Sequence, residues 1–154
     1  MNESPHWLEY VRALGPAIIA LFVAYVAYQQ WQVNAANLKE KLFDKRFEVF
    51  KCTQLFLSSI MQEAAVRDET LPEFFDAVQR SRFLFGKEIQ SYLDEIRKRA
   101  IKMRLHKAQL EGVPVGSERS KLVDLENAEL EWLSDQVSVI FDKFEPYLSF
   151  RKNK

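Results

Sequence analysis

The densest concentration of charge in this sequence lies between Arg97 and Lys107, in the stretch RKRAIKMRLHK. Six of its residues are lysine or arginine, one is histidine, and none is acidic. Such a run can bind the phosphates of RNA or the headgroups of anionic lipids, because each cation neutralises one negative charge. The candidate contacts to an anionic partner are Arg97, Lys98, Arg99, Lys102, Arg104 and Lys107.

The same run also has a structural interpretation, which we favour over binding to lipid or to nucleic acid. Acidic residues gather later in the chain, where no lysine or arginine occurs between Lys121 and Lys143. If the chain folds back on itself about residue 115, position 99 lies opposite 131 and position 104 lies opposite 126. Exposed ion pairs are worth only about 0 to 1 kcal/mol each, but several of them can set the register of a helical hairpin. The acids concerned are Asp124, Glu126, Glu129, Glu131 and Asp135.

Arg99 and His106 are separated by six residues, a spacing similar to the loose Arg-to-His signature of HEPN ribonucleases. Those enzymes are helical bundles that dimerise to form their cleft. Ala100 stands where a polar residue usually follows the arginine in that signature. The resemblance implies an RNA-cleaving site at Arg99 and His106, which is the weaker of the two alternative functions given below.

No other group of residues forms a catalytic or cofactor-binding motif. Four glycines leave no glycine-rich nucleotide loop, and two histidines with a single cysteine cannot build a usual zinc site or a disulfide framework. The 22 basic and 22 acidic residues balance to a net charge of zero, so the chain as a whole does not attract nucleic acid. We therefore expect a protein that is not an enzyme, needs no metal or cofactor, and does not have nucleic acid as its partner.

Composition predicts an all-α fold. Four glycines and five prolines in 154 residues are too few turn formers for a sandwich or barrel of many short strands. Hydrophobic residues make up 47% of the chain and charged residues 29%, which excludes intrinsic disorder. We expect one N-terminal transmembrane helix that continues into a cytoplasmic antiparallel helical bundle with a C-terminal helical hairpin.

The transmembrane helix is predicted from an uncharged segment between Arg12 and Lys39, in which Ala13 to Tyr28 is almost continuously apolar. A helix needs about 20 residues to cross a hydrocarbon core of about 30 Å. Amphipathic aromatic residues, which favour the headgroup level, extend the span at both ends. The predicted domains are a short interfacial segment at 1–12, the membrane helix and its exit at 13–37, and the bundle at 38–154. The predicted membrane-interface anchors are Trp7, Tyr10, Tyr28 and Trp31.

Two other interpretations of this segment stay open. A buried core helix would need a soluble domain large enough to surround it, which about 115 downstream residues can hardly provide. A cleaved signal peptide could end at Val33-Asn34-Ala35, but such peptides begin with basic residues, and the first eleven residues here contain none. A retained single span is the interpretation we favour.

The distribution of positive charge predicts the orientation of the span. Arg12 is the only basic residue on the N-terminal side, whereas Lys39, Lys41, Lys45 and Arg46 follow soon after the span. Because positively charged flanks stay in the cytoplasm, the N-terminus is expected outside and the C-terminal bundle inside, at the inner membrane.

Small residues recur along one face of the predicted span. Their spacing alternates between four and three residues, which places them in a single stripe on a helix. In lipid, close approach of backbones over small residues is a main source of helix association, so the stripe predicts homo-oligomerisation. A chance register of common membrane residues is the alternative. The stripe consists of Ala13, Ala17, Ala20, Ala24 and Ala27.

After the span, neither glycine nor proline occurs before Pro72, so the helix is expected to continue to about Arg67. Its apolar residues form two neighbouring rows, a face broad enough to require other helices around it. The rows are Leu38, Leu42, Lys45, Val49, Cys52, Phe56 and Ile60, and Phe43, Phe47, Phe50, Gln54, Leu57 and Met61.

Three more helices are predicted from their start and stop signals. Thr70 and Glu73 resemble the two ends of a capping box, and Gly86 is expected to stop this short helix. The next helix is expected over about 87–111. The last follows a hairpin tip at 112–116, begins at Ser117 or Ser120, and is expected to break at Pro146.

Three short motifs carry a resemblance to known proteins. They are LFDKRFEVF at 42–50, RFLFG at 82–86 and FEPYL at 144–148. With the preceding span, they resemble a scattered group of small bacterial membrane-anchored helical proteins whose function is unassigned. The resemblance covers most of the chain from Trp31 onward and implies a topology but no chemistry.

Together these features predict a non-enzymatic, membrane-anchored and homo-oligomeric scaffold or adaptor that presents a cytoplasmic helical bundle to a partner. The expected partners are membrane lipid, further copies of the chain and an unidentified cytoplasmic protein. An oligomeric membrane effector or pore component, as in phage defence, is the first alternative, and a HEPN-like ribonuclease is the second.

Overall fold

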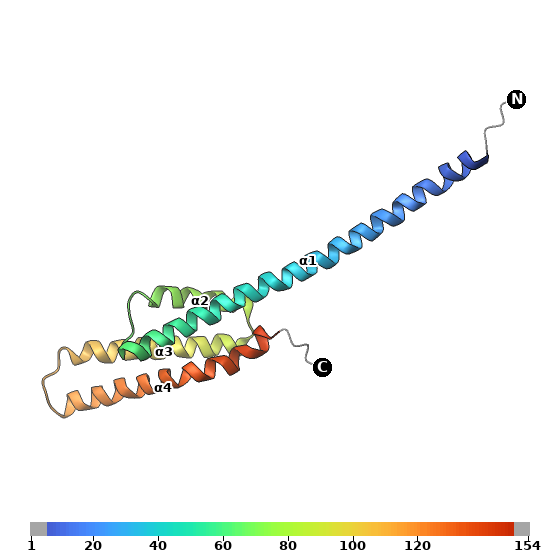
Figure 1. Cartoon of the computed structure of the whole chain (residues 1–154). Coiled ribbons are helices and arrows are strands. Elements are labelled where there is room, and N and C mark those ends of the chain that lie inside the picture. Colours follow the sequence, from blue (N-terminus) through green and yellow to red (C-terminus); the bar gives the residue numbers. More distant parts are fainter. Residues whose placement is uncertain (1–5, 150–154) are drawn as a thin grey trace. The chain divides into compact units, whose positions relative to one another are not determined.

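The computed structural model describes residues 6–149, and within this range the chain forms helices and no strands (Figure 1). Side chains are described from residue 14 onward. The prediction of an all-α fold is confirmed. The helices are α1 (His6–Glu63), α2 (Leu71–Leu84), α3 (Lys87–Leu110) and α4 (Ser117–Leu148).

The chain divides into two units, to which the described residues 6–41 and 42–149 belong. In the first unit the apolar side chains that follow Leu14 are exposed. One helix of the described chain is long and apolar enough to cross a membrane, by length and composition alone; it covers Leu14–Glu63, and its most apolar stretch is not buried. The alternative of a buried core helix is therefore wrong for this structure.

The second unit has a hydrophobic core to which all four helices contribute. At its centre Phe56 of α1 and Phe74 of α2 stack face to face, with ring centroids 4.2 Å apart and both side chains almost fully buried. The largest fully buried residues are Val49, Phe56, Leu57 and Ile60 of α1, Phe74 of α2, Ile89, Leu93, Ile96 and Met103 of α3, and Leu133, Ile140 and Phe144 of α4.

The inward face of α1 is narrower than the two predicted rows. Phe47 and Met61 were expected to face the bundle, yet they are 44% and 52% exposed. Thr53 belongs to neither row and is fully buried. Its hydroxyl donates a hydrogen bond of 2.8 Å to the Val49 carbonyl, which removes the cost of burying this polar group.

The end of α1 also differs from the prediction. The helix was expected to continue to about Arg67, but it ends at Glu63. Ala64 follows with φ at 49°, the left-handed conformation that ends many helices and that glycine usually supplies. Because alanine stands here, the sequence carries no stop signal at this position.

The predicted roles of Thr70 as a helix cap and of Gly86 as a helix stop are both wrong. Thr70 makes no side-chain cap, because its hydroxyl donates backward to the Arg67 carbonyl at 3.3 Å. Gly86 was expected to stop α2, but α2 ends at Leu84 and Gly86 stands directly before α3. A Cβ at Gly86 would lie 3.3 Å from the Tyr147 hydroxyl, so glycine allows a close approach here.

Pro146 does not break α4, which continues to Leu148. Proline has no N–H to bond to the Asp142 carbonyl, so α4 lacks one hydrogen bond here and continues for two more residues. The last turn is closed by the Ser149 N–H, which donates to the Glu145 carbonyl at 2.9 Å.

We predict that the Phe56→Ala variant loses about 3 to 5 kcal/mol of free energy of unfolding, because it removes a buried ring and leaves a cavity beside Phe74. Leu55→Ala is the matched control on the same helix, since Leu55 is exposed. The control should stay within about 0.5 kcal/mol of wild type. Urea unfolding followed by circular dichroism measures both values, and equal losses in the two variants would contradict this account of the core.

Candidate functional site

The six cations of the predicted anion contact point in different directions around α3. A helix turns by about 100° per residue, so Lys98 and Lys102 share one side, whereas Lys107 lies well over a quarter turn from Lys102. These three lysines are exposed and make no ion pair within the described part of the chain. The structure therefore does not bring the six predicted contacts together on one surface.

The three arginines of the run are engaged by acidic residues. Arg97 pairs with Asp94 of the same helix at 3.0 Å, and Arg104 pairs with Asp68 before α2. Of the predicted register pairs, Arg104 with Glu126 is not formed, because Arg104 points to Asp68 instead.

Arg99 is the cation of the run that binds α4. Its guanidinium lies 2.9 Å from Glu95 and 3.2 Å from Glu129. It also lies over the Trp132 ring, 4.3 Å from the centroid. The predicted partner position, 131, lies between Glu129 and Trp132, the two residues of α4 that Arg99 contacts. Because the Glu129 side chain is only 12% exposed, this pair is less screened by water than the others.

These contacts bear on the predicted ribonuclease site. Arg99 and His106 lie two helical turns apart on the same side of α3. The charge of Arg99 is already balanced by Glu95 and Glu129, so this guanidinium has little left for a phosphate. The Nδ1 atom of His106 is buried without a hydrogen-bond partner in the described chain.

The alanine stripe lies in the first unit. Ala17, Ala20, Ala24 and Ala27 are exposed along α1, as an association face requires. The predicted site residues Trp7, Tyr10 and Ala13 lie outside the residues whose side chains are described.

Two tyrosines at the end of the apolar segment accept hydrogen bonds from glutamine side chains. These hydrogen bonds were not predicted from the sequence. Gln29 donates a hydrogen bond to the Tyr25 hydroxyl at 3.0 Å, and Gln32 donates to the Tyr28 hydroxyl at 2.8 Å. The rings of Tyr28 and Trp31 are stacked, with centroids 6.3 Å apart. The spacing of four residues between tyrosine and glutamine is the signal that could have revealed these pairs.

The three motifs of the resemblance meet at Arg46 in the second unit. The Arg46 Nε donates a hydrogen bond of 3.0 Å to the Leu84 carbonyl, at the end of α2. Its guanidinium lies 5.8 Å from the ring centroid of Phe85 and 5.6 Å from that of Tyr147. Residues of all three motifs therefore belong to one contact centred on Arg46.

An aromatic cluster extends from the Arg46 contact into the core. The Phe85 ring meets Phe144 and Tyr147 edge-on, at 5.2 and 5.3 Å between centroids. Phe50 of α1 contacts Phe144 and Phe141 of α4, at 5.5 and 5.4 Å. Edge-to-face pairs of this kind add stability beyond the area that they bury.

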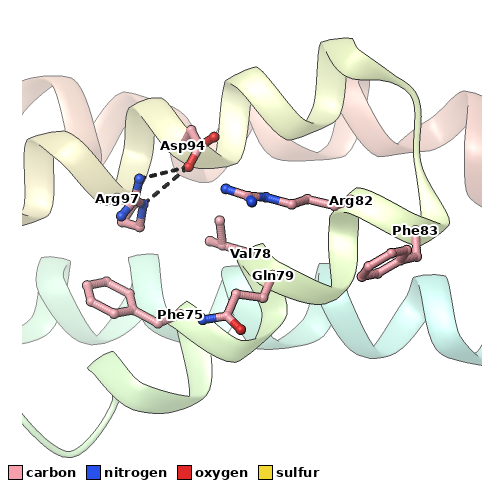
Figure 2. A pocket seen from close by; sticks show the side chains of 7 residues that line it. All are labelled: Phe75, Val78, Gln79, Arg82, Phe83, Asp94 and Arg97. Carbon is pink, nitrogen blue, oxygen red and sulfur yellow. Dashed lines mark hydrogen bonds and ion pairs between the residues drawn. The ribbon is translucent and has the colours of Figure 1, made fainter.

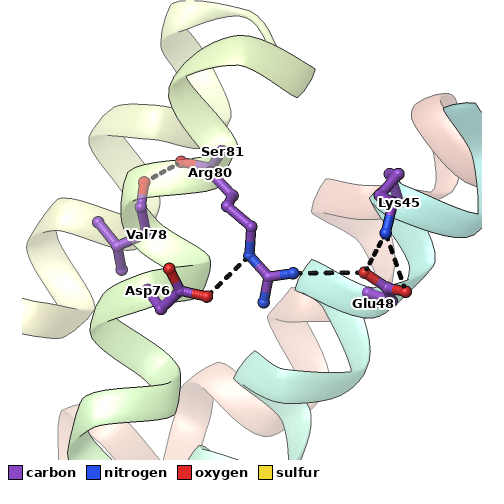
Figure 3. A network of polar contacts seen from close by, with 6 residues as sticks. All are labelled: Lys45, Glu48, Asp76, Val78, Arg80 and Ser81. Atoms are coloured by element: carbon purple, nitrogen blue, oxygen red, sulfur yellow. Dashed lines mark hydrogen bonds and ion pairs between the residues drawn. The ribbon is translucent and has the colours of Figure 1, made fainter.

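A second polar link joins α1 and α2 (Figure 3). Glu48 of α1 lies 3.3 Å from Lys45 and 3.3 Å from Arg80 of α2. Arg80 also lies 3.0 Å from Asp76 one turn earlier. These side chains are substantially exposed, so the network contributes orientation more than stability.

The lone cysteine lies beside this network. Burial of the half-buried Cys52 raises the pKa of its thiol, and the negative charge of Glu73 raises it further. The thiol is therefore protonated at neutral pH and is a poor nucleophile.

A groove lies between α2 and α3 and was not predicted (Figure 2). Its volume is about 360 Å³. We call it the α2–α3 groove, and it is lined by Phe75, Val78, Gln79, Arg82 and Phe83 of α2 and by Asp94 and Arg97 of α3. The recurrence of its α2 residues at steps of three and four was visible in the sequence.

Among the described residues, no group of three or more His, Cys, Asp or Glu side chains is placed to hold a metal ion. Comparisons with protein-family models, with curated proteins and with solved structures found no match.

We predict that Arg99→Gln lowers the free energy of unfolding by about 1 to 2 kcal/mol, because it removes the contacts with Glu129 and Trp132 together. Lys98→Gln is the matched control, since it removes an exposed charge that makes no ion pair. It should change stability by less than about 0.5 kcal/mol. Urea unfolding decides between them, and an unchanged Arg99→Gln variant would mean that the interhelix contact has no structural weight.

We also predict that Cys52 reacts slowly with iodoacetamide and that its rate still rises above pH 9, because only the thiolate reacts and the pKa of this thiol is raised. The comparison is a Leu55→Cys, Cys52→Ser variant, whose exposed thiol should reach half of its maximal rate at pH ~8.5, a lower pH than for Cys52. Mass spectrometry gives both rates. Equal rates and equal pH profiles would show that the environment of Cys52 does not perturb it.

Proposed function

We propose that this chain is a single-pass inner-membrane protein whose cytoplasmic helical bundle serves as a non-enzymatic scaffold or adaptor, assembled through its membrane helix. The observation that carries this proposal is in α1. One helix contains both an exposed apolar segment, from Leu14 to beyond Tyr28, and residues such as Val49 and Phe56 in the core of the second unit.

The exposed apolar segment supports a membrane location. In water, a continuous row of exposed apolar side chains is unfavourable, whereas in a bilayer the same row lies in its preferred environment. The basic residues Lys39, Lys41 and Lys45 follow this segment closely and favour a cytoplasmic location for the residues after it.

The ion pairs between α3 and α4 support an antiparallel bundle with a C-terminal helical hairpin. Glu88 near the start of α3 pairs with Lys143 near the end of α4, at 2.9 Å. Farther along α3, Arg99 pairs with Glu129, which lies earlier on α4. In an antiparallel pair of helices, residues later in one helix contact residues earlier in the other, and these two ion pairs follow that order.

The exposed alanine stripe supports assembly through the membrane helix. Ala17, Ala20, Ala24 and Ala27 leave one face of α1 with little side-chain volume, so two copies can approach closely. On this proposal the bundle contributes no catalysis. The arginines of the basic run pair with acidic residues of the fold, and several copies present the same bundle to a cytoplasmic protein.

We predict that replacing Ala17, Ala20 and Ala24 together by leucine shifts the protein toward monomer, because the larger side chains keep the helices apart. The matched control replaces Ile18, Phe22 and Val26 by leucine, on other faces of the helix. Native mass spectrometry in nanodiscs measures the copy number of wild type and both variants.

Three outcomes are decisive. Loss of the oligomer in the alanine variant alone supports the proposal, and a monomeric wild type or an unchanged alanine variant contradicts assembly through the stripe. A ring of several copies that leaks ions when overexpressed, and no longer leaks without residues 13–37, would favour the pore component instead.

A further inference from the structure

The α2–α3 groove combines an apolar surface with a cation that has no partner. The half-buried Phe75 and the 91% exposed Phe83 supply apolar surface, and Val78, which is only 4% exposed, belongs to the lining. Arg82 is exposed and makes no ion pair in the described chain. Figure 2 shows its guanidinium extending from α2 toward the Asp94–Arg97 pair of α3.

The charges that face the groove leave one positive charge in excess. Arg97 is balanced by Asp94, whose Oδ1 accepts from the Arg97 Nε at 3.2 Å. Arg82 shares the groove with Asp94 but makes no ion pair with it, so among these three charges one positive charge is not balanced. A guanidinium that is free to form two parallel hydrogen bonds is well suited to a carboxylate.

We propose that the α2–α3 groove binds a short acidic peptide segment of a partner protein, with a carboxylate on Arg82 and a neighbouring aromatic or aliphatic side chain against Phe75, Val78 and Phe83. The polar groups of Gln79 and Asp94 are placed at the same groove, where they can bond to the peptide backbone. This inference rests on the proposed adaptor function and names the chemistry of the partner.

The observations favour a peptide over other anions. One excess positive charge is too little to follow a nucleic-acid backbone, which carries a charge at every nucleotide. A lipid surface would require cations grouped on one face, and the free lysines of α3 are dispersed. A volume of about 360 Å³ is near the lower limit for ligand pockets and suits a few side chains of an extended segment.

The test is a selection of random twelve-residue peptides displayed on phage, with the full-length protein in nanodiscs of uncharged lipid as the target. We expect enrichment of sequences in which Asp or Glu stands within a few positions of Phe, Leu or Ile. Empty nanodiscs serve as the subtraction control. No enrichment, or enrichment of basic peptides, would overturn the proposal.

The enriched peptide is then synthesised with a fluorescent label, and its affinity is measured by anisotropy. Arg82→Gln should weaken binding about tenfold, as expected for one lost charge-assisted contact. Lys98→Gln removes the same charge outside the groove and should leave the affinity unchanged. Equal affinity for the Arg82→Gln variant and wild type, or equal losses in both variants, would place the peptide elsewhere.

A failure here can be told apart from a failure of the proposed function. The peptide selection is repeated on the variant with leucine at positions 17, 20 and 24. If wild type assembles but no peptide is enriched, the scaffold stands and the groove proposal is wrong. If the protein is monomeric and the peptide still binds through Arg82, the groove proposal holds for a monomeric adaptor.

Discussion

The contact of Arg46 with the end of α2 links three distant segments of the second unit. Helix ends leave carbonyl groups without partners, and the Arg46 Nε satisfies the one on Leu84. The same guanidinium covers the rings of Phe85 and Tyr147, so its charge lies against aromatic faces. One side chain of α1 thereby fixes the turn before α3 and the end of α4, and the aromatic cluster can close behind it.

Two other arginines also link neighbouring helices. Arg80 links α2 to Glu48 of α1, and Arg99 links α3 to Glu129 and Trp132 of α4. In the basic run at 97–107, the three arginines pair with acidic residues, whereas the three lysines are exposed and make no ion pair within the described chain. Arg82 differs from these arginines, since it faces a groove and makes no ion pair in the described part of the chain.

Much of the fold was predictable because the chain punctuates its helices with proline and glycine. The start of α2 beside Pro72 and the end of α3 before Gly112 were visible in the sequence. Neither of the expected pairs across the hairpin forms as predicted, because Arg99 contacts Glu129 and Trp132, and Arg104 pairs with Asp68. The end of α1 at Glu63 was not visible, since the left-handed conformation that follows it belongs to Ala64, a residue type that rarely adopts it. The prediction that Gly86 stops α2 was wrong. Glycine at this position leaves room for the hydroxyl of Tyr147, which lies sixty-one residues away in the sequence. The α2–α3 groove was also missed, since it exists only where two helices meet.

At the end of the apolar part of α1, polar side chains pair with each other: Gln29 donates to the Tyr25 hydroxyl, and Gln32 donates to the Tyr28 hydroxyl. The apolar stretch from 13 to 28 measures about 24 Å along a helix, and the stretch from 13 to 32 about 30 Å. An amide that is already bonded to a phenol costs less to transfer into an apolar medium than a free one. If this helix spans a bilayer, the two hydrogen bonds remove part of the cost of moving Gln29 and Gln32 into the hydrocarbon region, which favours tolerance of a small hydrophobic mismatch at this end of the span.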